Sequence, residues 1–290
     1  MVDTPMPPTS SEVLTHRTTD GGETWSTNRQ TVSLGRGEYV GGSLAVHRAG
    51  TAWLMARAQT SSAGSSAVLL RTSDAGATWS TFALPVAGAI RFSTPSHGWL
   101  AGGAVANQLY ETHDGGETWE AKELPPGAQR SPGTTLTGPH FFTPASGVLP
   151  VQQQLDTGGS VLQFFTTTDA GRSWAAKGEP LHVHRGGSIF DGEFSLASFV
   201  DESTWYVLAD SLLVTRDGGE TFLPVRSDRD LSSVSQMAFP SVDDGWVKLT
   251  LNPCSGARAD TDPHRSDCAN EARVLRTSDG GASWVEQPLK

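Results

Sequence analysis

The chain has 290 residues, including 32 glycines and 17 prolines, which is long enough for a β-rich domain with a substantial core. Its formal net charge of −10 argues against non-specific binding to nucleic acid or to an anionic membrane, because both select a basic protein face. No apolar run reaches the ~18 residues that a membrane-spanning helix needs. We therefore expect neither nucleic acid nor membrane insertion among the partners.

Residues 1–11 are polar and rich in proline, and they lack the apolar core of a signal peptide. We interpret them as a linker or tag-like segment, or as the start left after a targeting segment was removed. Residues 12–290 are predicted to form one domain.

An eight-residue motif, T-x-D-[GA]-G-x-[TS]-[WF], occurs six times in this domain. Its aspartates recur at intervals of 54, 40, 55, 48 and 62 residues, and they are Asp20, Asp74, Asp114, Asp169, Asp217 and Asp279. Periods of this size indicate repeats in which each unit is one supersecondary element.

The motif resembles the Asp box, or BNR repeat, of sialidase-like and photosystem-assembly-factor-like β-propellers. The resemblance covers nearly the whole chain and implies an all-β fold of four-stranded antiparallel blades. An aspartate suits the turn because its carboxylate accepts backbone N–H groups just ahead, and the glycine two residues later suits a positive φ. A role in catalysis or metal binding would not explain six equivalent copies, so we interpret the boxes as structural.

Each of the last five boxes follows a predicted hairpin and a third strand. The hairpins pair short apolar strands such as 44–46, 90–92 and 237–239 with strands that open near Trp53, Trp99 and Trp246. The first box has only residues 12–17 before it, enough for one strand. We therefore expect six blades with an incomplete first blade, and seven blades in a longer parent chain as the alternative.

Candidate binding residues lie where the resembling families bind ligands, at the channel face opposite the Asp boxes. Arg91 and His140 occupy matching places on predicted innermost strands. The connection 182–193 is richest in polar groups, and it contributes His182, His184, Arg185, Asp191 and Glu193. The two histidines alternate along a strand, so with Asp191 they could hold a metal or act in acid–base chemistry. The alternative interpretation is a polar, solvated loop, and we expect no metal or cofactor.

Sialidase activity is not expected, because no Arg-Ile-Pro precedes the first box and Glu38 and Tyr39 are adjacent residues that point to opposite faces of a strand. Another glycoside hydrolase needs two carboxylates facing the channel. The candidates are Asp156, Asp191, Glu193, Asp228 and Asp230, and no motif selects among them.

The repeat style matches the photosystem-assembly-factor type best, which implies a scaffold without catalysis. Our first hypothesis is therefore a non-catalytic propeller that binds a protein or a glycan. The alternative is a glycoside hydrolase or lyase of non-sialidase type.

The only cysteines, Cys254 and Cys268, enclose a polar insertion before the last box. A disulfide between them is our preferred prediction, with free thiols and a metal site as the alternatives. A disulfide would indicate a location outside the cytoplasm.

Overall fold

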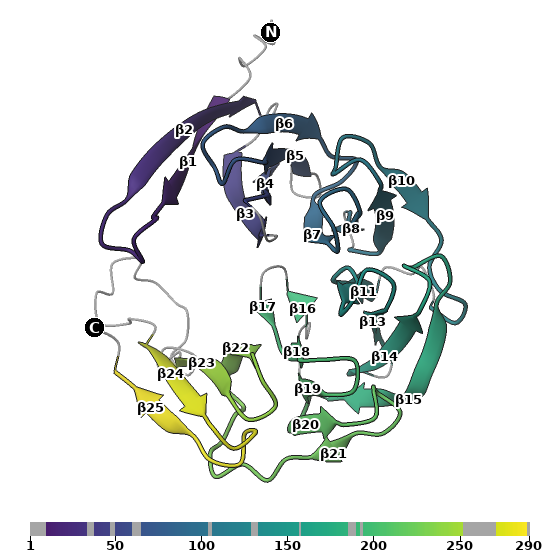
Figure 1. Ribbon diagram of the computed structural model, residues 1–290. Helices are drawn as coiled ribbons and strands as arrows, with labels where there is room; N and C mark the ends of the chain where they lie inside the picture. The colour runs from purple at the N-terminus through teal and green to yellow at the C-terminus, as the bar shows by residue number, and fades with distance from the viewer. Residues whose placement is uncertain are drawn as a thin grey trace, which may run out of the picture. The chain divides into compact units, whose positions relative to one another are not determined.

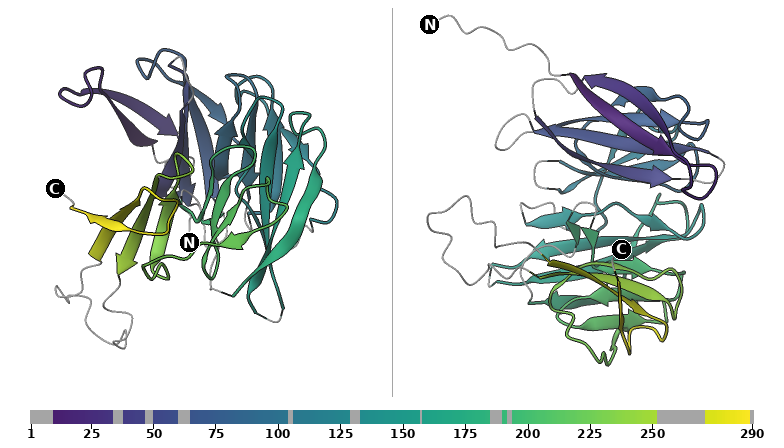
Figure 2. Two further views of the ribbon diagram at one scale, coloured as in Figure 1. Left: turned by 60° about the horizontal axis from the view of Figure 1, so that its bottom comes forward. Right: turned by 90° about the vertical axis from the view of Figure 1, so that its left-hand side faces the viewer.

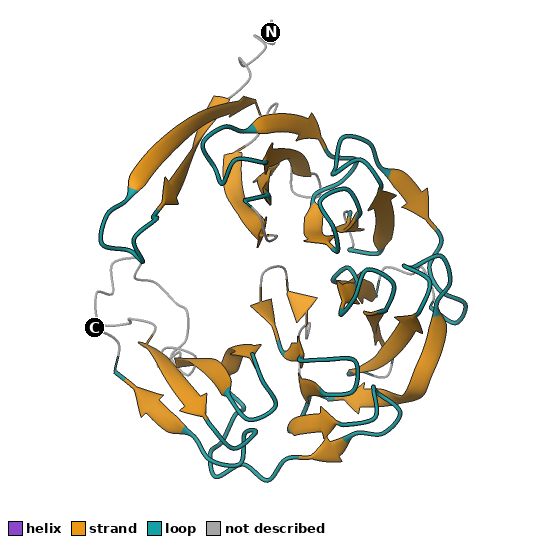
Figure 3. Cartoon of the chain, viewed as in Figure 1, coloured by secondary structure: helices purple, strands orange, loops and turns teal. Residues whose placement is uncertain are grey.

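The computed structural model describes residues 10–33, 38–46, 50–59, 65–103, 106–128, 133–156, 158–184, 190–191, 194–251 and 271–288. These residues form strands and turns and no helix (Figure 3). This part of the chain accordingly holds no helix that is long and apolar enough to cross a membrane.

Most strands belong to five antiparallel sheets (Figure 1). Four of these sheets have four strands in consecutive order, and sheet 3 has a short fifth strand. Sheet 1 contains β3 (Glu38–Val46), β4 (Ala52–Gln59), β5 (Ser65–Thr72) and β6 (Ser80–Ala83). Sheet 2 contains β7 (Gly88–Phe92), β8 (Gly98–Gly102), β9 (Gln108–Thr112) and β10 (Glu120–Lys122). Sheet 3 contains β11 (Thr134–Leu136), β13 (Gly147–Gln154), β14 (Ser160–Thr167) and β15 (Ala175–Val183), and the short β12 (His140–Phe141) also pairs with β13.

Two further sheets repeat this order. Sheet 4 contains β18 (Ala197–Phe199), β19 (Trp205–Leu208), β20 (Leu212–Thr215) and β21 (Leu223–Pro224). Sheet 5 contains β22 (Val234–Ala238), β23 (Gly245–Leu251), β24 (Glu271–Thr277) and β25 (Val285–Gln287). In all five sheets an Asp box joins the third strand to the fourth, as the sequence predicts.

Two pairs of strands stand apart from the five sheets. β1 (Ser10–Arg17) and β2 (Ser26–Ser33) form a two-stranded ribbon joined by the first Asp box (Figure 2). β16 (Phe190–Asp191) and β17 (Phe194–Ser195) form a shorter pair. The predicted count of six or seven blades is therefore not supported, because the described residues around the first box supply two strands instead of four.

The chain divides into two compact units, residues 1–151 with 167–174 and residues 152–166 with 175–290. The core of the first unit contains Trp53, Leu69, Ile90 and Leu100. Trp53 of β4 stacks on Phe92 of β7 with ring centroids 3.7 Å apart. The first strands β3 and β7 of sheets 1 and 2 are also in contact (Figure 1).

In the second unit, aromatic side chains likewise link neighbouring sheets. Tyr206 of β19 stacks on Phe239 with ring centroids 3.8 Å apart, and its hydroxyl donates to the carbonyl oxygen of Val242 at 2.7 Å. Phe239 in turn meets the edge of Trp284 at 6.1 Å. Such pairs add to the free energy of burying the rings, so they hold sheets 4 and 5 together. Tyr206 is fully buried.

Candidate functional site

Every Asp box has the same internal hydrogen bonds. In box 3, Thr112 Oγ1 donates to Asp114 Oδ1 at 2.8 Å, and the backbone N–H of Thr118 donates to the same oxygen at 2.9 Å. The Thr118 hydroxyl donates to Asp114 Oδ2 at 2.6 Å, and the backbone N–H of Gly116 donates to Thr112 Oγ1 at 3.0 Å. The other five boxes repeat these four bonds between equivalent atoms.

These bonds stabilise the ionised carboxylates. The hydroxyl of Thr78 and the backbone N–H of Thr78 lower the pKa of Asp74 to about 2. Burial alone would raise the pKa of Asp114, but its bonds to Thr118 and Thr112 lower it to about 2. A carboxylate in this environment stays ionised at neutral pH, and its oxygens accept the hydrogen bonds of the turn. It is therefore a poor proton donor for catalysis. The geometry supports the structural interpretation of the boxes.

The backbone of each box is left-handed at two successive positions. The glycines that the sequence predicts at positive φ are confirmed, with Gly116 at 95° and Gly281 at 93°. The preceding residue is also left-handed, including Ala75 at 58° and Ala170 at 63°. We did not predict this second position, and its alanines are strained because their Cβ atoms crowd the backbone.

In the five complete sheets, this second position ties the box to the turn between the first two strands. The N–H of Gly115 donates to the carbonyl oxygen of Ser96 at 2.8 Å, and that of Ala170 donates to Ala145 at 2.8 Å. Ala75, Gly218 and Gly280 make the corresponding bonds to Gly50, Ser203 and Asp243. The boxes therefore serve as connectors at one end of each sheet.

Arg91 and His140 form the first candidate site. Arg91 lies on β7 and His140 on β12, and the positive charge of Arg91 acts on the imidazole of His140. Burial, followed by the positive charge of Arg91, lowers the pKa of His140 to about 4, so its imidazole is neutral at pH 7. The sequence-based prediction that these two residues occupy matching places is consistent with this interaction.

Arg91 is exposed to solvent, yet burial lowers the pKa of its guanidinium. The residue therefore has exposed atoms, while protein atoms near its guanidinium lower that group's pKa. Its Nη1 donates to its neighbour's carbonyl oxygen, that of Ile90, at 3.0 Å. A guanidinium has five N–H donors, so Arg91 retains donors for a ligand.

The second candidate group, in the connection 182–193, is brought together only in part. His184 Nδ1 lies 2.7 Å from Asp210 Oδ2, and the His184 backbone N–H donates to Asp210 Oδ1 at 2.9 Å. His182 is exposed on β15, and no contact joins it to His184 among the described residues. Arg185 and Glu193, together with the side chain of Asp191, lie outside the described residues, as do Cys254 and Cys268.

The candidate carboxylates do not form a described catalytic pair. Asp228 Oδ1 accepts the backbone N–H of Trp284 at 3.1 Å, and Asp230 Oδ1 accepts that of Ser232 at 2.9 Å. Asp156 is exposed. Within the described residues, every carboxyl group whose pKa departs from its ordinary value departs downward, whereas a glycosidase acid needs a raised pKa.

A third group of polar residues lies at the box end of sheet 2, and we did not predict it. Glu111 of β9 is buried, and its two oxygens meet His97 Nε2 at 2.7 Å and Lys122 Nζ at 2.8 Å. His113 Nε2 lies 3.4 Å from Glu111 Oε2. The sequence signal for this group was weak, because the neighbours of a single glutamate on a strand are known only once the pairing register is known.

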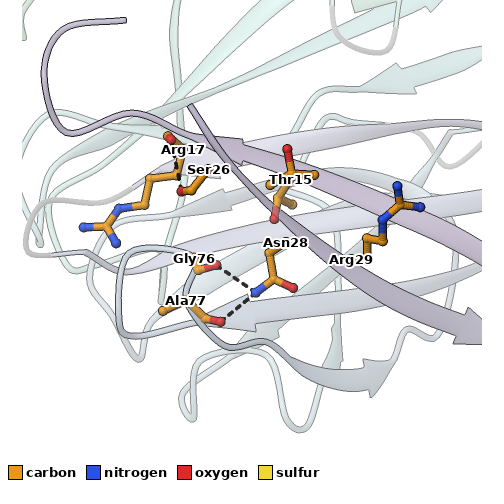
Figure 4. Close-up of a pocket in the computed structure, with 8 residues that line it drawn as sticks. Thr15, Arg17, Ser26, Asn28, Arg29, Gly76 and Ala77 are labelled. Carbon is orange, nitrogen blue, oxygen red and sulfur yellow. Dashed lines mark hydrogen bonds between the residues drawn. The ribbon is translucent and has the colours of Figure 1, made fainter. Parts of the chain in front are cut away.

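A cavity of about 440 Å³ lies in the first unit between the β1–β2 ribbon and box 2 (Figure 4). Arg17 and Arg29 are its charged residues, and Arg29 pairs with Glu12 at 3.1 Å. Asn28 Nδ2 donates across it to the carbonyl oxygens of Gly76 at 3.3 Å and Ala77 at 2.6 Å. These contacts fasten the ribbon to sheet 1, so we assign the cavity a structural role.

Residues 110–121, which contain box 3, match the family model of the BNR/Asp-box repeat. A comparison with curated proteins gave no match.

Solved structures to which the chain is similar include two enzymes and one protein of unknown function. One is the GH74 xyloglucanase from Xanthomonas campestris, with a TM-score of 0.56 and 15% identity over 85% of this chain and 38% of the xyloglucanase. Another is a protein of unknown function from Dyadobacter fermentans DSM 18053, with a TM-score of 0.53 and 15% identity over 88% of this chain and 84% of that protein. A Trypanosoma rangeli sialidase has a TM-score of 0.49 and 13% identity over 97% and 53% of the two chains.

At these identities the likeness shows the fold alone. The chain spans only 38% of the xyloglucanase, so that enzyme's activity does not transfer with the fold. The closer likeness to the photosystem-assembly-factor type is not confirmed. The repeat match and the five sheets together show an all-β, propeller-type fold with BNR/Asp-box repeats and five four-stranded antiparallel blades.

Proposed function

We propose that the protein is a non-catalytic binding propeller that holds a protein or glycan ligand through an acidic group. The observation that carries this proposal is the exposed guanidinium of Arg91 beside a neutral His140. A guanidinium binds a carboxylate with two parallel hydrogen bonds, and a neutral imidazole adds one donor or acceptor. The pair supplies directional recognition of an anionic group without supplying an acid catalyst.

The absence of a paired acid and base among the described carboxylates supports binding over hydrolysis. Their pKa values are lowered by local hydrogen bonds, as for Asp217 and its bonds to Thr221. A hydrolase or lyase remains the competing proposal, and it would rest on Asp191 or Glu193, which the described residues do not test. The interaction of Arg91 with His140 does not support this competing proposal.

A glycan array and a pull-down from an envelope fraction test the proposal, followed by titration of any captured ligand. Arg91→Ala should weaken binding by roughly tenfold or more, since a charge-assisted pair is lost. Arg226→Ala provides the control, because Arg226 is also exposed but has no histidine partner in the described structure. Equal affinity of both variants and the unchanged protein would remove Arg91 from the site. Release of shortened or unsaturated products from a bound glycan would favour the enzyme.

We also propose that the protein works outside the cytoplasm, with a disulfide between Cys254 and Cys268. The support is their place at either end of a polar insertion, because a covalent bond would limit the freedom of a segment that has little apolar surface. Intact mass after alkylation checks this proposal. We expect labelling of both thiols only after reduction, and labelling without reduction would contradict it.

A further inference from the structure

The box end of sheet 2 gathers three titratable side chains around one buried carboxylate. The carboxylate belongs to Glu111, of which only 6% of the side chain is exposed. His97 comes from the turn before β8, His113 from box 3 and Lys122 from β10. The nearest donor atoms of His97, Glu111 and His113 all lie within 4.8 Å of one another.

The local sequence explains why these residues meet. The turn that ends at His97 and box 3 lie at the same end of sheet 2, because each joins antiparallel neighbours. Pairing of β8 with β9 places Trp99 opposite Glu111, and Glu120 of β10 lies opposite Glu111 on its other side. Two glutamates in direct cross-strand contact repel, so the site requires a cation. Lys122 supplies one, at 2.8 Å from Glu111 and 3.0 Å from Glu120.

The two histidines differ in how far the surrounding side chains hold their rings. His97 contacts Trp99 at 5.9 Å and Phe141 at 6.1 Å between ring centroids, and its Nδ1 lies 3.3 Å from Ser93 Oγ. These contacts orient its Nε2 toward Glu111. His113 stacks on His97 with centroids 4.8 Å apart, but 68% of its side chain is exposed, so it is free to turn.

We propose that His97, Glu111 and His113 bind a divalent transition metal, with Zn²⁺ as the best match. Two imidazole nitrogens and one carboxylate oxygen are ligands that zinc takes at about 2.0–2.2 Å, usually with a fourth position for water. The donor atoms are already close enough to converge after a small rotation of His113. The ion replaces the Lys122 ammonium as the cation beside Glu111, and Ser93 keeps the outer nitrogen of His97 hydrogen-bonded.

The variable position of the Asp box provides a clean test. It is Thr19, Ser73, Thr168, Arg216 or Ser278 in the other boxes, so His113→Ser is compatible with the turn. We expect this variant to keep its melting temperature without metal and to lose roughly tenfold or more in zinc affinity by calorimetric titration. His16→Ser is the matched control, since His16 is an exposed histidine elsewhere in the same unit, with its Nδ1 3.0 Å from Thr27 Oγ1.

A second variant reports on the competition between the ion and the lysine. Lys122→Met frees one oxygen of Glu111, so it should bind zinc more tightly than the unchanged protein. Substitution with Co²⁺ should give a spectrum of nitrogen and oxygen ligands, without the thiolate band that a site at Cys254 or Cys268 would produce. The proposal is wrong if the protein shows no saturable zinc binding, or if His113→Ser binds zinc as tightly as His16→Ser does. In either case the cluster serves only to neutralise Glu111.

Discussion

Box 1 and box 6 have the same internal hydrogen bonds and opposite degrees of burial. Asp20 accepts the backbone N–H of Thr24 at 2.9 Å, as Asp279 does from Ser283 at 2.9 Å. Yet Trp25 is 60% exposed, whereas Trp284 is 2% exposed. The turn thus forms from local sequence, while the burial of its aromatic residue depends on the sheet around it.

The difference is also visible in the glycines of the two boxes. A Cβ added at Gly22 would approach only Trp25 of its own box, at 3.8 Å. At Gly281 it would collide with Leu212 of β20, and at Gly116 with Leu69 of β5, each on a neighbouring sheet. At Gly116 and Gly281 the glycine therefore has a second role, because it allows neighbouring sheets to approach closely.

The largest expected effect comes from removing the aromatic residue in each setting. Trp284→Ala should lower the free energy of unfolding by about 3–5 kcal/mol, since it empties a buried site. Trp25→Ala should change it by about 0.5 kcal/mol or less, as is usual for an exposed side chain. Urea denaturation of the two variants measures both values. Similar losses in the two variants would show that the ribbon is packed in solution.

The aspartates provide the next comparison. Asp114→Ala removes four hydrogen bonds to one carboxylate and should destabilise the fold by about 1–3 kcal/mol without a specific loss of ligand binding. Asp20→Ala should instead loosen the β1–β2 ribbon locally, which hydrogen exchange of its amides would detect. If Asp114→Ala kept its melting temperature and lost ligand binding, the structural role of the boxes would be wrong.

A pH titration sharpens the comparison, because it separates the boxes from His140 of sheet 3. The pKa of His140 is about 4 in the folded chain against 6.5 for the free side chain, so the unfolded chain binds more protons between these values. Stability should consequently fall by about 2–3 kcal/mol as the pH drops from 6.5 to 4. The box carboxylates lower stability in a more acidic range, as the pH falls from their ordinary pKa of 3.8 toward about 2.

His140→Gln should remove the dependence of stability on pH only between pH 6.5 and 4. Thermal melts at several pH values measure this dependence. A variant that retains the full slope between pH 6.5 and 4 would show that another group titrates there.

Much of the fold was predictable because its signals are local. The bonds of box 3 join Thr112 to Thr118, a span of seven residues, and the hairpins before the last five boxes lie within short segments. The blade count was not predictable from these signals, since box 1 forms its turn on two strands as readily as the others do on four. A local motif reports a turn, and it does not report the strands that complete a sheet.

The candidate sites divide in the same way. Arg91 and His140 could be chosen from the sequence because they hold equivalent positions in successive repeats, and a ligand-binding role for them stays a prediction. The cluster around Glu111 could not be chosen from the sequence, because it depends on the register that pairs Trp99 with Glu111 and brings two turns together. Likewise, Arg71 of sheet 1 donates to the carbonyl oxygen of Asp114 at 2.7 Å, a contact between repeats that neither segment reveals alone.

The smallest expected effect concerns the residue after each box aspartate. Ala170 has a φ of 63°, a conformation that costs an alanine about 1–2 kcal/mol and glycine much less. Ala170→Gly relieves this strain and keeps the bond from its N–H to Ala145, but the unfolded chain gains freedom that offsets part of the benefit. We expect a net gain in unfolding free energy of about 0.5–1 kcal/mol.

Replacing glycine by alanine at the same box position separates the cost of backbone strain from the cost of crowding by neighbouring atoms. Gly21→Ala in box 1 places a Cβ with no other atom within 4 Å, so it should cost the strain alone. Gly115→Ala in box 3 puts a Cβ 2.6 Å from Arg71 Nη1 and 2.8 Å from the carbonyl oxygen of Pro95, so it should cost more. Differential scanning calorimetry of the three variants ranks them. A loss of stability in Ala170→Gly would mean that the left-handed alanine is not strained, and equal losses in Gly21→Ala and Gly115→Ala would mean that neighbouring sheets yield to the added methyl group.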